Sequence, residues 1–304
     1  MTTKWFTDVG GQVLQGVDGV YVEAFNAVVE GAGMEGRDPA FVQVAFAHKP
    51  DFITPQDYIV RAPYSNPKNF KGDMAASAKR GWLESVGEGQ YTVSDKGAEV
   101  VGRLLGALNE GAAGIESLPD AELERIHDLL QKVVNKAHEL PEPAKKWSME
   151  WGKRFQKAFV VEGAPTLVRV RRRIVDMFAF RDDGHLAAWK AVEDDGQIWD
   201  AFTNVWRDEA NTAAELAEQL SGRNYDQASY AAALGELAKR GWITQEDDKY
   251  VATEKGSKLR QEVKDVTDQY FDAPWKVLTE AETKELEGLM KKLAEAVKLP
   301  EEEE

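Results

Sequence analysis

The chain has 304 residues, of which 43% are hydrophobic, and a formal net charge of −15. This length accommodates two domains of ordinary size, and the lack of cysteine excludes disulfides, thiolate metal ligands and a cysteine nucleophile. No run approaches the roughly 20 apolar residues that span a bilayer, and the first residues lack the basic-then-apolar order of a secretion signal, so the expected location is the cytoplasm.

The first expected element is a packing helix near the N-terminus. Its apolar face is predicted to carry Val13, Val17, Val20, Ala24 and Val28. The run GAGMEG at residues 31–36 follows no predicted strand, so it indicates a helix end rather than a phosphate-binding loop.

From Thr54 to Gly97 the sequence predicts helix, turn, helix and a two-stranded wing. TPQDYIVRA is a helix that stops at a proline, and YSNP is the turn. The second helix, residues 67–80, is expected to bury Phe70, Met74 and Ala78. A Gly-Trp pair then ends the helix and places the aromatic ring under a hairpin built from WLES and QYTVS.

A longer helix follows the first wing, and its apolar residues are spaced alternately by three and four. They are Leu123, Ile126, Leu130, Val133, Ala137 and Leu140. A matching seam near the C-terminus contains Leu286, Met290, Leu293 and Val297. We expect these two seams to join the halves of the chain.

The second half repeats the first with an offset of about 160 positions. Ala-Lys-Arg-Gly-Trp occurs at 78–82 and again at 238–242, and a Lys-Gly pair after each wing occurs at 96–97 and 255–256. We therefore predict two repeats, residues 1–142 and residues 143–304.

The second copy follows the same order of elements. Thr212 is predicted to cap a helix with Glu215 in a capping box. A second helix buries Tyr230, Leu234 and Leu237, and a hairpin encloses EDD. The final helix of this copy is expected to bury Leu259, Val263, Val266 and Tyr270.

The runs AKRGWLES…YTVSDKG and AKRGWITQ…YVATEKG resemble the winged-helix segment of the MarR family of regulators. The resemblance implies a mainly α fold with small β-hairpin wings, in which two winged helix-turn-helix repeats are joined by a helical bundle. It also implies a monomer that acts as an intramolecular pseudo-dimer, because related proteins form the same body from two subunits.

The resemblance further implies a transcriptional regulator that binds double-stranded DNA. The DNA contacts carried over to this sequence are Arg61, Asn66, Lys68, Asn69, Lys71 and Arg80 in the first copy, and Arg223, Asn224, Gln227 and Arg240 in the second. Residues near the start of the recognition helix would meet base edges, and Arg61 and Arg80 would reach phosphates.

Charge favours the first copy over the second as a DNA-binding unit. Residues 54–97 contain six Lys or Arg and five Asp or Glu, whereas residues 212–256 contain five and eight. Neither wing keeps the Asp-x-Arg of the family, and an acidic wing tip would repel phosphates. The alternative is a tandem winged-helix module that binds a small molecule or a protein partner and not DNA.

The most basic stretch, LVRVRRRIVDMF, contains Arg169, Arg171, Arg172 and Arg173. It is either a phosphate-contacting strip or, as we favour at this overall charge, a helix whose arginines pair with acidic neighbours.

Aromatic residues gather where the two copies diverge. HLAAWKAVEDDGQIWDAFTNVW is expected to form two short helices with its aromatic rings inward. These rings are either core or the lining of a pocket for a small apolar effector; the candidate pocket residues are Phe25, Phe46, Trp189, Trp199 and Trp206.

No motif indicates catalysis, a cofactor or a metal site. His127 and His138 are eleven residues apart, which gives no close ligand pair, and no HExxH-type motif occurs. We therefore expect a binding protein rather than an enzyme.

Overall fold

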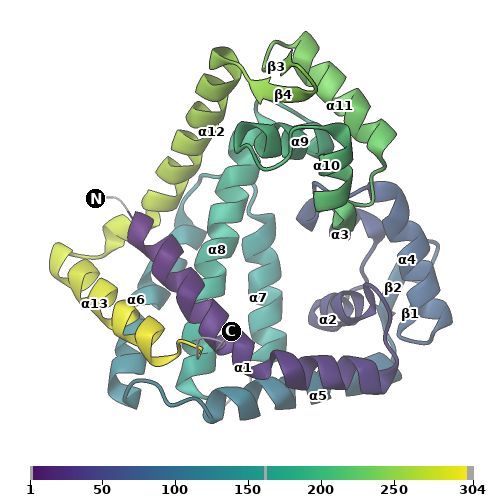
Figure 1. The fold of residues 1–304 in the computed structure, drawn as a ribbon. Coiled ribbons are helices and arrows are strands. Elements are labelled where there is room, and N and C mark those ends of the chain that lie inside the picture. Colours follow the sequence, from purple (N-terminus) through teal and green to yellow (C-terminus); the bar gives the residue numbers. More distant parts are fainter. Residues whose placement is uncertain (1–2, 161–162, 300–304) are drawn as a thin grey trace. The chain divides into compact units, whose positions relative to one another are not determined.

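The computed structural model describes residues 3–160 and 163–299 of the chain (Figure 1). These residues are mainly helical, and their strands form two separate two-stranded antiparallel sheets. The predicted fold class, mainly α with small β-hairpin wings, is confirmed.

Contacts divide the chain into two compact units. One comprises the residues up to Ile53, Met74–Asp183 and the residues from Tyr270 onward; the other comprises Thr54–Asp73 and Gly184–Gln269. These units are not the two repeats, because each contains residues of both halves. The repeat limits 1–142 and 143–304 therefore stay a prediction.

The first copy of the repeat has the predicted order of elements. It consists of α2 (Asp38–His48), α3 (Pro55–Arg61), α4 (Pro67–Lys79), β1 (Leu83–Gly87), β2 (Gln90–Val93) and α5 (Asp95–Ala113). Thr54 and Asp57 form a capping box that starts α3. In α4, Phe70 and Met74 are fully buried as predicted, whereas Ala78 is only half-buried.

The second copy has the same order. It consists of α9 (Gly196–Trp206), α10 (Ala213–Gln219), the short 3₁₀ helix η1 (Ser221–Arg223), α11 (Gln227–Lys239), β3 (Ile243–Glu246), β4 (Lys249–Ala252) and α12 (Glu254–Asp272). The predicted capping box of Thr212 and Glu215 starts α10. Tyr230, Leu234 and Leu237 are buried as predicted.

The remaining described elements flank these two copies. They are α1 (Lys4–Ala32), α6 (Asp120–Glu139), α7 (Trp147–Phe159), α8 (Thr166–Lys190), η2 (Pro274–Val277) and α13 (Glu280–Ala296). The predicted pair of short helices around Trp189 and Trp199 is not observed, because the first of them is the end of the long helix α8.

The residues shared by both copies hold each wing to the helix before it. Gly81 and Gly241 end α4 and α11 with positive φ angles of 81° and 71°. The hydroxyls of Ser94 and Thr253 each donate a 2.7 Å hydrogen bond to the carbonyl of that glycine. The repeated segment Ala-Lys-Arg-Gly-Trp therefore connects α4 and α11 to the wings and to the helices that follow them.

The glycine of the repeated Lys-Gly pair is required by close packing. A Cβ atom on Gly97 would lie 2.5 Å from the carbonyl oxygen of Trp82, and Gly256 lies equally tightly against the backbone of Trp242. The preceding lysine, Lys96, donates a hydrogen bond to the carbonyl of Arg80 and lies 3.5 Å above the Trp82 ring.

The predicted apolar stripes are wrong at two positions of α1 and at one of α12. Val20 on α1 is 45% exposed, because this part of α1 makes its close contacts through Gly16 and Gly19 instead. Ala24 is also exposed. Val266 on α12 is 37% exposed, and the buried neighbour is Thr267, whose hydroxyl donates to a backbone carbonyl. Glycine and threonine carry little hydrophobic signal, so the sequence pattern missed both positions.

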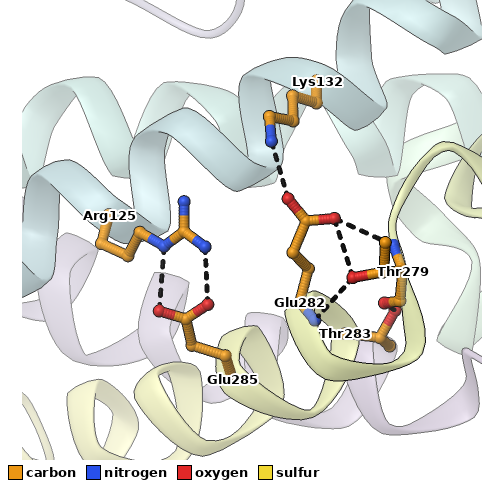
Figure 2. A network of polar contacts seen from close by, with 6 residues as sticks. All are labelled: Arg125, Lys132, Thr279, Glu282, Thr283 and Glu285. Atoms are coloured by element: carbon orange, nitrogen blue, oxygen red, sulfur yellow. Dashed lines mark hydrogen bonds and ion pairs between the residues drawn. The ribbon is translucent and has the colours of Figure 1, made fainter.

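The two predicted seams meet in the core that α6 and α13 share. Polar pairs flank this core (Figure 2): Arg125 donates two hydrogen bonds to Glu285, of 2.9 and 2.6 Å, and Lys132 contacts Glu282 at 2.7 Å. Lys292 contacts Glu122 at 3.4 Å. Glu282 also caps α13 by accepting from Thr279.

Candidate nucleic-acid interface and apolar cavity

The start of α4 presents the exposed basic residues that the sequence predicted for the first copy. Lys68 and Lys71 are exposed, and Asn69 is half-buried. Asn66 caps the helix, because its side-chain oxygen accepts from the Lys68 backbone N–H at 3.1 Å. The side chain of Arg61 lies outside the described residues.

The guanidinium of Arg80 is engaged in an ion pair within the protein. It donates two 2.8 Å hydrogen bonds to Asp38, whose side chain is fully buried. Burial by itself would raise the pKa of the Asp38 carboxyl, but the bonds from Arg80 and from the Glu35 backbone N–H lower it overall. The structure therefore ties this predicted phosphate contact to α2.

Arg240, the matching residue of the second copy, is also paired. It contacts the buried carboxylate of Glu193 and donates a 3.1 Å hydrogen bond to Glu236. The neighbouring wing turn contains Asp247 and Asp248, both exposed. Gln227 is exposed at the first position of α11. The second recognition helix is thus surrounded by carboxylates rather than by unpaired cations.

Three predicted DNA contacts are brought together, and they bind one another. The backbone N–H of Asn66 donates to the carbonyl of Arg223 at 2.8 Å, and its side-chain amide donates to the carbonyl of Asn224 at 3.1 Å. The guanidinium of Arg223 lies 5.3 Å from the centre of the Tyr64 ring and 3.0 Å from a carboxylate oxygen of Asp200. The turn of one helix-turn-helix is therefore in direct contact with the turn of the other.

The basic stretch on α8 is neutralised by ion pairs, as we favoured. Arg169 pairs with Glu124 and Arg171 with Asp18, while Arg172 and Arg173 both pair with Asp176. Because these last two arginines share one carboxylate, the cluster keeps one positive charge in excess. This excess lies beside a cavity.

The cavity has a volume of about 250 Å³ and is lined by α1, α2, α5, α7 and α8. Its walls are mainly apolar and include Phe25, Phe155 and Phe159, and the last two rings stack at 5.0 Å. Arg171 and Arg172 supply its charged side. Arg171 also donates a 2.9 Å hydrogen bond to the hydroxyl of Tyr21, whose pKa is raised chiefly by burial.

The predicted pocket residues divide between this cavity and a core. Phe25 lines the cavity, and Phe46 packs 5.8 Å from the Phe159 ring that lines it. Trp189 and Trp199 are buried and stack at 6.0 Å in the core of the second winged helix, and Trp206 is partly buried against the same core. The sequence missed the phenylalanines of α7, although their spacing of four is typical of one helix face.

A group of possible metal ligands lies on α6. One ligand atom from each of Glu124, His127 and Asp128 lies within 4.8 Å of the others. Glu124 is already bound to Arg169, so its carboxylate is engaged in an ion pair. This arrangement gives no support to a metal site.

Comparison with known proteins identifies one region of the chain. A family model described as a helix-turn-helix family matches residues 179–299, which contain α9 to α13 and the end of α8. No curated protein and no solved structure matches the chain. Among the described helices, none is long and apolar enough to cross a membrane. The second half of the chain contains a helix-turn-helix domain.

Proposed function

We propose that the chain is a transcriptional regulator of MarR-like type, which binds double-stranded DNA mainly through α4 and responds to a small effector. The observation that carries the proposal is the exposed basic start of α4, with Lys68 and Lys71, within a chain whose other copy matches a helix-turn-helix family. Helix-turn-helix proteins meet base edges with this end of the recognition helix.

The first copy supplies the DNA contact in this proposal, and the second copy contributes little. Arg80 and Arg240 are held in ion pairs, and the second wing is acidic. With the phosphates contacted by Lys68 and Lys71 neutralised, the logarithm of affinity should fall with the logarithm of salt with a slope of about −2. This dependence of affinity on salt is weak for a DNA-binding regulator, and it follows from the net negative charge of the chain.

The effector is expected to be a small apolar molecule with one acidic group. An apolar body suits the phenylalanine and leucine walls of the cavity, and the unbalanced charge beside Arg172 favours an anion. Arg171 and Tyr21 offer further donors at the same side.

A second candidate function is a winged-helix module that binds the small molecule but not DNA. It is favoured by the contact that Asn66, Arg223 and Asn224 make with one another. In this case the duplicated fold would serve only as the frame around the cavity.

Selection from random duplex DNA at two salt concentrations separates the two candidates. The regulator enriches a motif, and Lys68→Ala/Lys71→Ala reduces the salt slope by about 2. The control, Lys258→Ala/Lys284→Ala, removes two exposed lysines of α12 and α13 and leaves the slope unchanged. Failure to enrich any sequence at low salt would reject the regulator and support the binding module.

A further inference from the structure

We infer that the contact between the two helix-turn-helix turns is an autoinhibitory latch, for which duplex DNA and the turn of the other copy compete. The inference rests on the proposed function, because it assigns the described conformation to the state that does not bind DNA. Its elements are the start of α4, the 3₁₀ helix η1 and the start of α11, all within one compact unit.

The latch uses the atoms that a recognition helix would offer to DNA. Asn66 stands directly before α4, and both its backbone N–H and its side-chain amide donate to carbonyls of the other turn. In that turn Asn224 adopts a left-handed conformation with φ of 58°, which directs its carbonyl to Asn66. Donors engaged in this way are not free to bind bases or phosphates.

Arg223 is the charged member of the latch. Its guanidinium lies over the ring of Tyr64 from the opposite turn and is bound to Asp200 of its own copy. The sequence-based assignment makes Arg223 a DNA contact, whereas the structure makes it a contact between turns. The two assignments predict opposite effects when Arg223 is removed.

The turns approach each other too closely for DNA to enter between them. The first residue of α9, Gly196, packs directly against the carbonyl of Pro63, leaving no space for a side chain. A recognition helix must lie in a major groove about 12 Å wide, with its N-terminal end against base edges. With the turns in contact, Asn66 before α4 and Asn224 before α11 are not open to such a groove.

The polar contacts of the latch are individually weak. Beside the packing of Tyr64 on the Trp189 ring and of Pro63 on Gly196, they include two hydrogen bonds and one cation–π contact, and Asn66, Arg223 and Asn224 are all partly or fully exposed. Polar contacts of this kind shift an equilibrium by roughly tenfold each at most. Binding of DNA to the open state competes with these contacts.

The first test is the sign of the change in DNA affinity on Arg223→Ala. Loss of the guanidinium should tighten binding to a selected duplex by about twofold to fivefold, the effect of one cation–π contact at a partly exposed site. Loss of a phosphate contact would weaken it. Arg207→Ala is the matched control, because Arg207 lies at the end of α9 in the same unit and pairs only loosely with Glu209 at 3.8 Å.

A second variant is needed as a control for misfolding of the Arg223→Ala protein. In that protein the largely buried Asp200 carboxylate loses this partner. Asn66→Ser keeps a side-chain oxygen to cap α4 but loses the amide donor to Asn224. It should also tighten DNA binding, although by a smaller factor.

A distance measurement tests the latch without DNA. The chain has no cysteine, so Gly72→Cys on α4 and Ala232→Cys on α11 give two unique spin-label sites. Both positions are exposed, and a Cβ at Gly72 meets no atom within 4 Å. The labelled protein should show one short distance, and adding Arg223→Ala should broaden and lengthen it.

The outcomes separate the latch from the proposed function. A longer distance together with tighter DNA binding supports both. An unchanged distance in the Arg223→Ala protein overturns the latch, even if DNA binds. A longer distance with no DNA bound by either protein overturns the proposed function and leaves only a contact between turns.

Discussion

Gly256 packs directly against the backbone of Trp242, so that a Cβ atom on Gly256 would lie 2.9 Å from the Trp242 carbonyl carbon. The same relationship joins Gly97 to Trp82. Each of these glycines lies in the first turn of the helix after a wing, and each tryptophan follows the glycine that ends the helix before the wing. The conformation of both wings therefore depends on two positions without side chains.

Gly256→Ala should destabilise the protein by about 1–3 kcal/mol, because the added methyl group forces the wing and α12 apart. The control is Gly235→Ala in the interior of α11, where an added Cβ meets no atom within 4 Å. This second change should stabilise by about 0.5–1 kcal/mol through helix propensity. Urea denaturation of the two variants should thus give midpoints that move in opposite directions, and equal shifts would contradict the packing argument.

The ion pair between Asp38 and Arg80 should matter more for stability than a surface pair. Asp38→Asn removes the charge that two guanidinium bonds and one backbone N–H require, and the fully buried position admits little water. The expected cost is about 1–3 kcal/mol in unfolding free energy. Asp128→Asn, at a largely exposed position of α6, is the control and should leave the midpoint nearly unchanged.

The lowered pKa of Glu282 leads us to expect that the protein loses stability at acid pH. Its bond from Lys132, followed by those from the Thr279 backbone N–H and hydroxyl, lowers its pKa from 4.5 to about 2. A carboxyl whose folded pKa is lowered stabilises the fold above its unfolded pKa and loses that effect as pH falls to the folded value. The urea midpoint should therefore drop between about pH 4.5 and pH 2.

The matched variant for this pH effect is Glu282→Gln. It keeps a side-chain oxygen near Thr279 but does not titrate, so its midpoint should vary less over the same pH range. An NMR titration that gives Glu282 an ordinary pKa would disprove the contribution of the network in Figure 2.

The cavity predicts a preference for anions over neutral and cationic analogues. Benzoate should raise the melting temperature at concentrations where benzamide and benzylamine do not, because Arg172 and Arg173 share the single carboxylate of Asp176. Leu108→Trp, which places a larger ring in the cavity wall, should abolish the benzoate effect without loss of the fold. Equal shifts by all three probes would remove the basis for an acidic effector.

Local chemistry made much of the fold predictable. The capping boxes at Thr212 and the glycine-ended recognition helices are encoded within a few residues, and the repeat located both wings. The buried stripes of α4 and α11 also follow directly from helical periodicity. These features depend on neighbours in sequence, which a single chain displays.

The candidate site was less predictable because its contacts are distant in sequence. The pairing of Asn66 with Arg223 and Asn224 joins two turns, and polar turn residues carry no periodic signal that would reveal a partner. The cavity combines five helices, so Phe25 was found but the rings of α7 were not. The buried tryptophans looked like pocket residues since composition does not distinguish a lining from a core.

The pairs between α6 and α13 show how two similar segments of one chain differ from the same segment in identical subunits. Arg125 and Glu285 are 160 residues apart, the offset of the repeat, so each occupies the place of the other. In a symmetric assembly of identical subunits such a position meets its own copy, and arginine would face arginine. Two similar segments of one chain are free of this restriction, because a substitution in one does not appear in the other, and an attractive pair can form where like charges would repel. The same freedom lets α4 carry exposed lysines near its start, where α11 starts with Gln227.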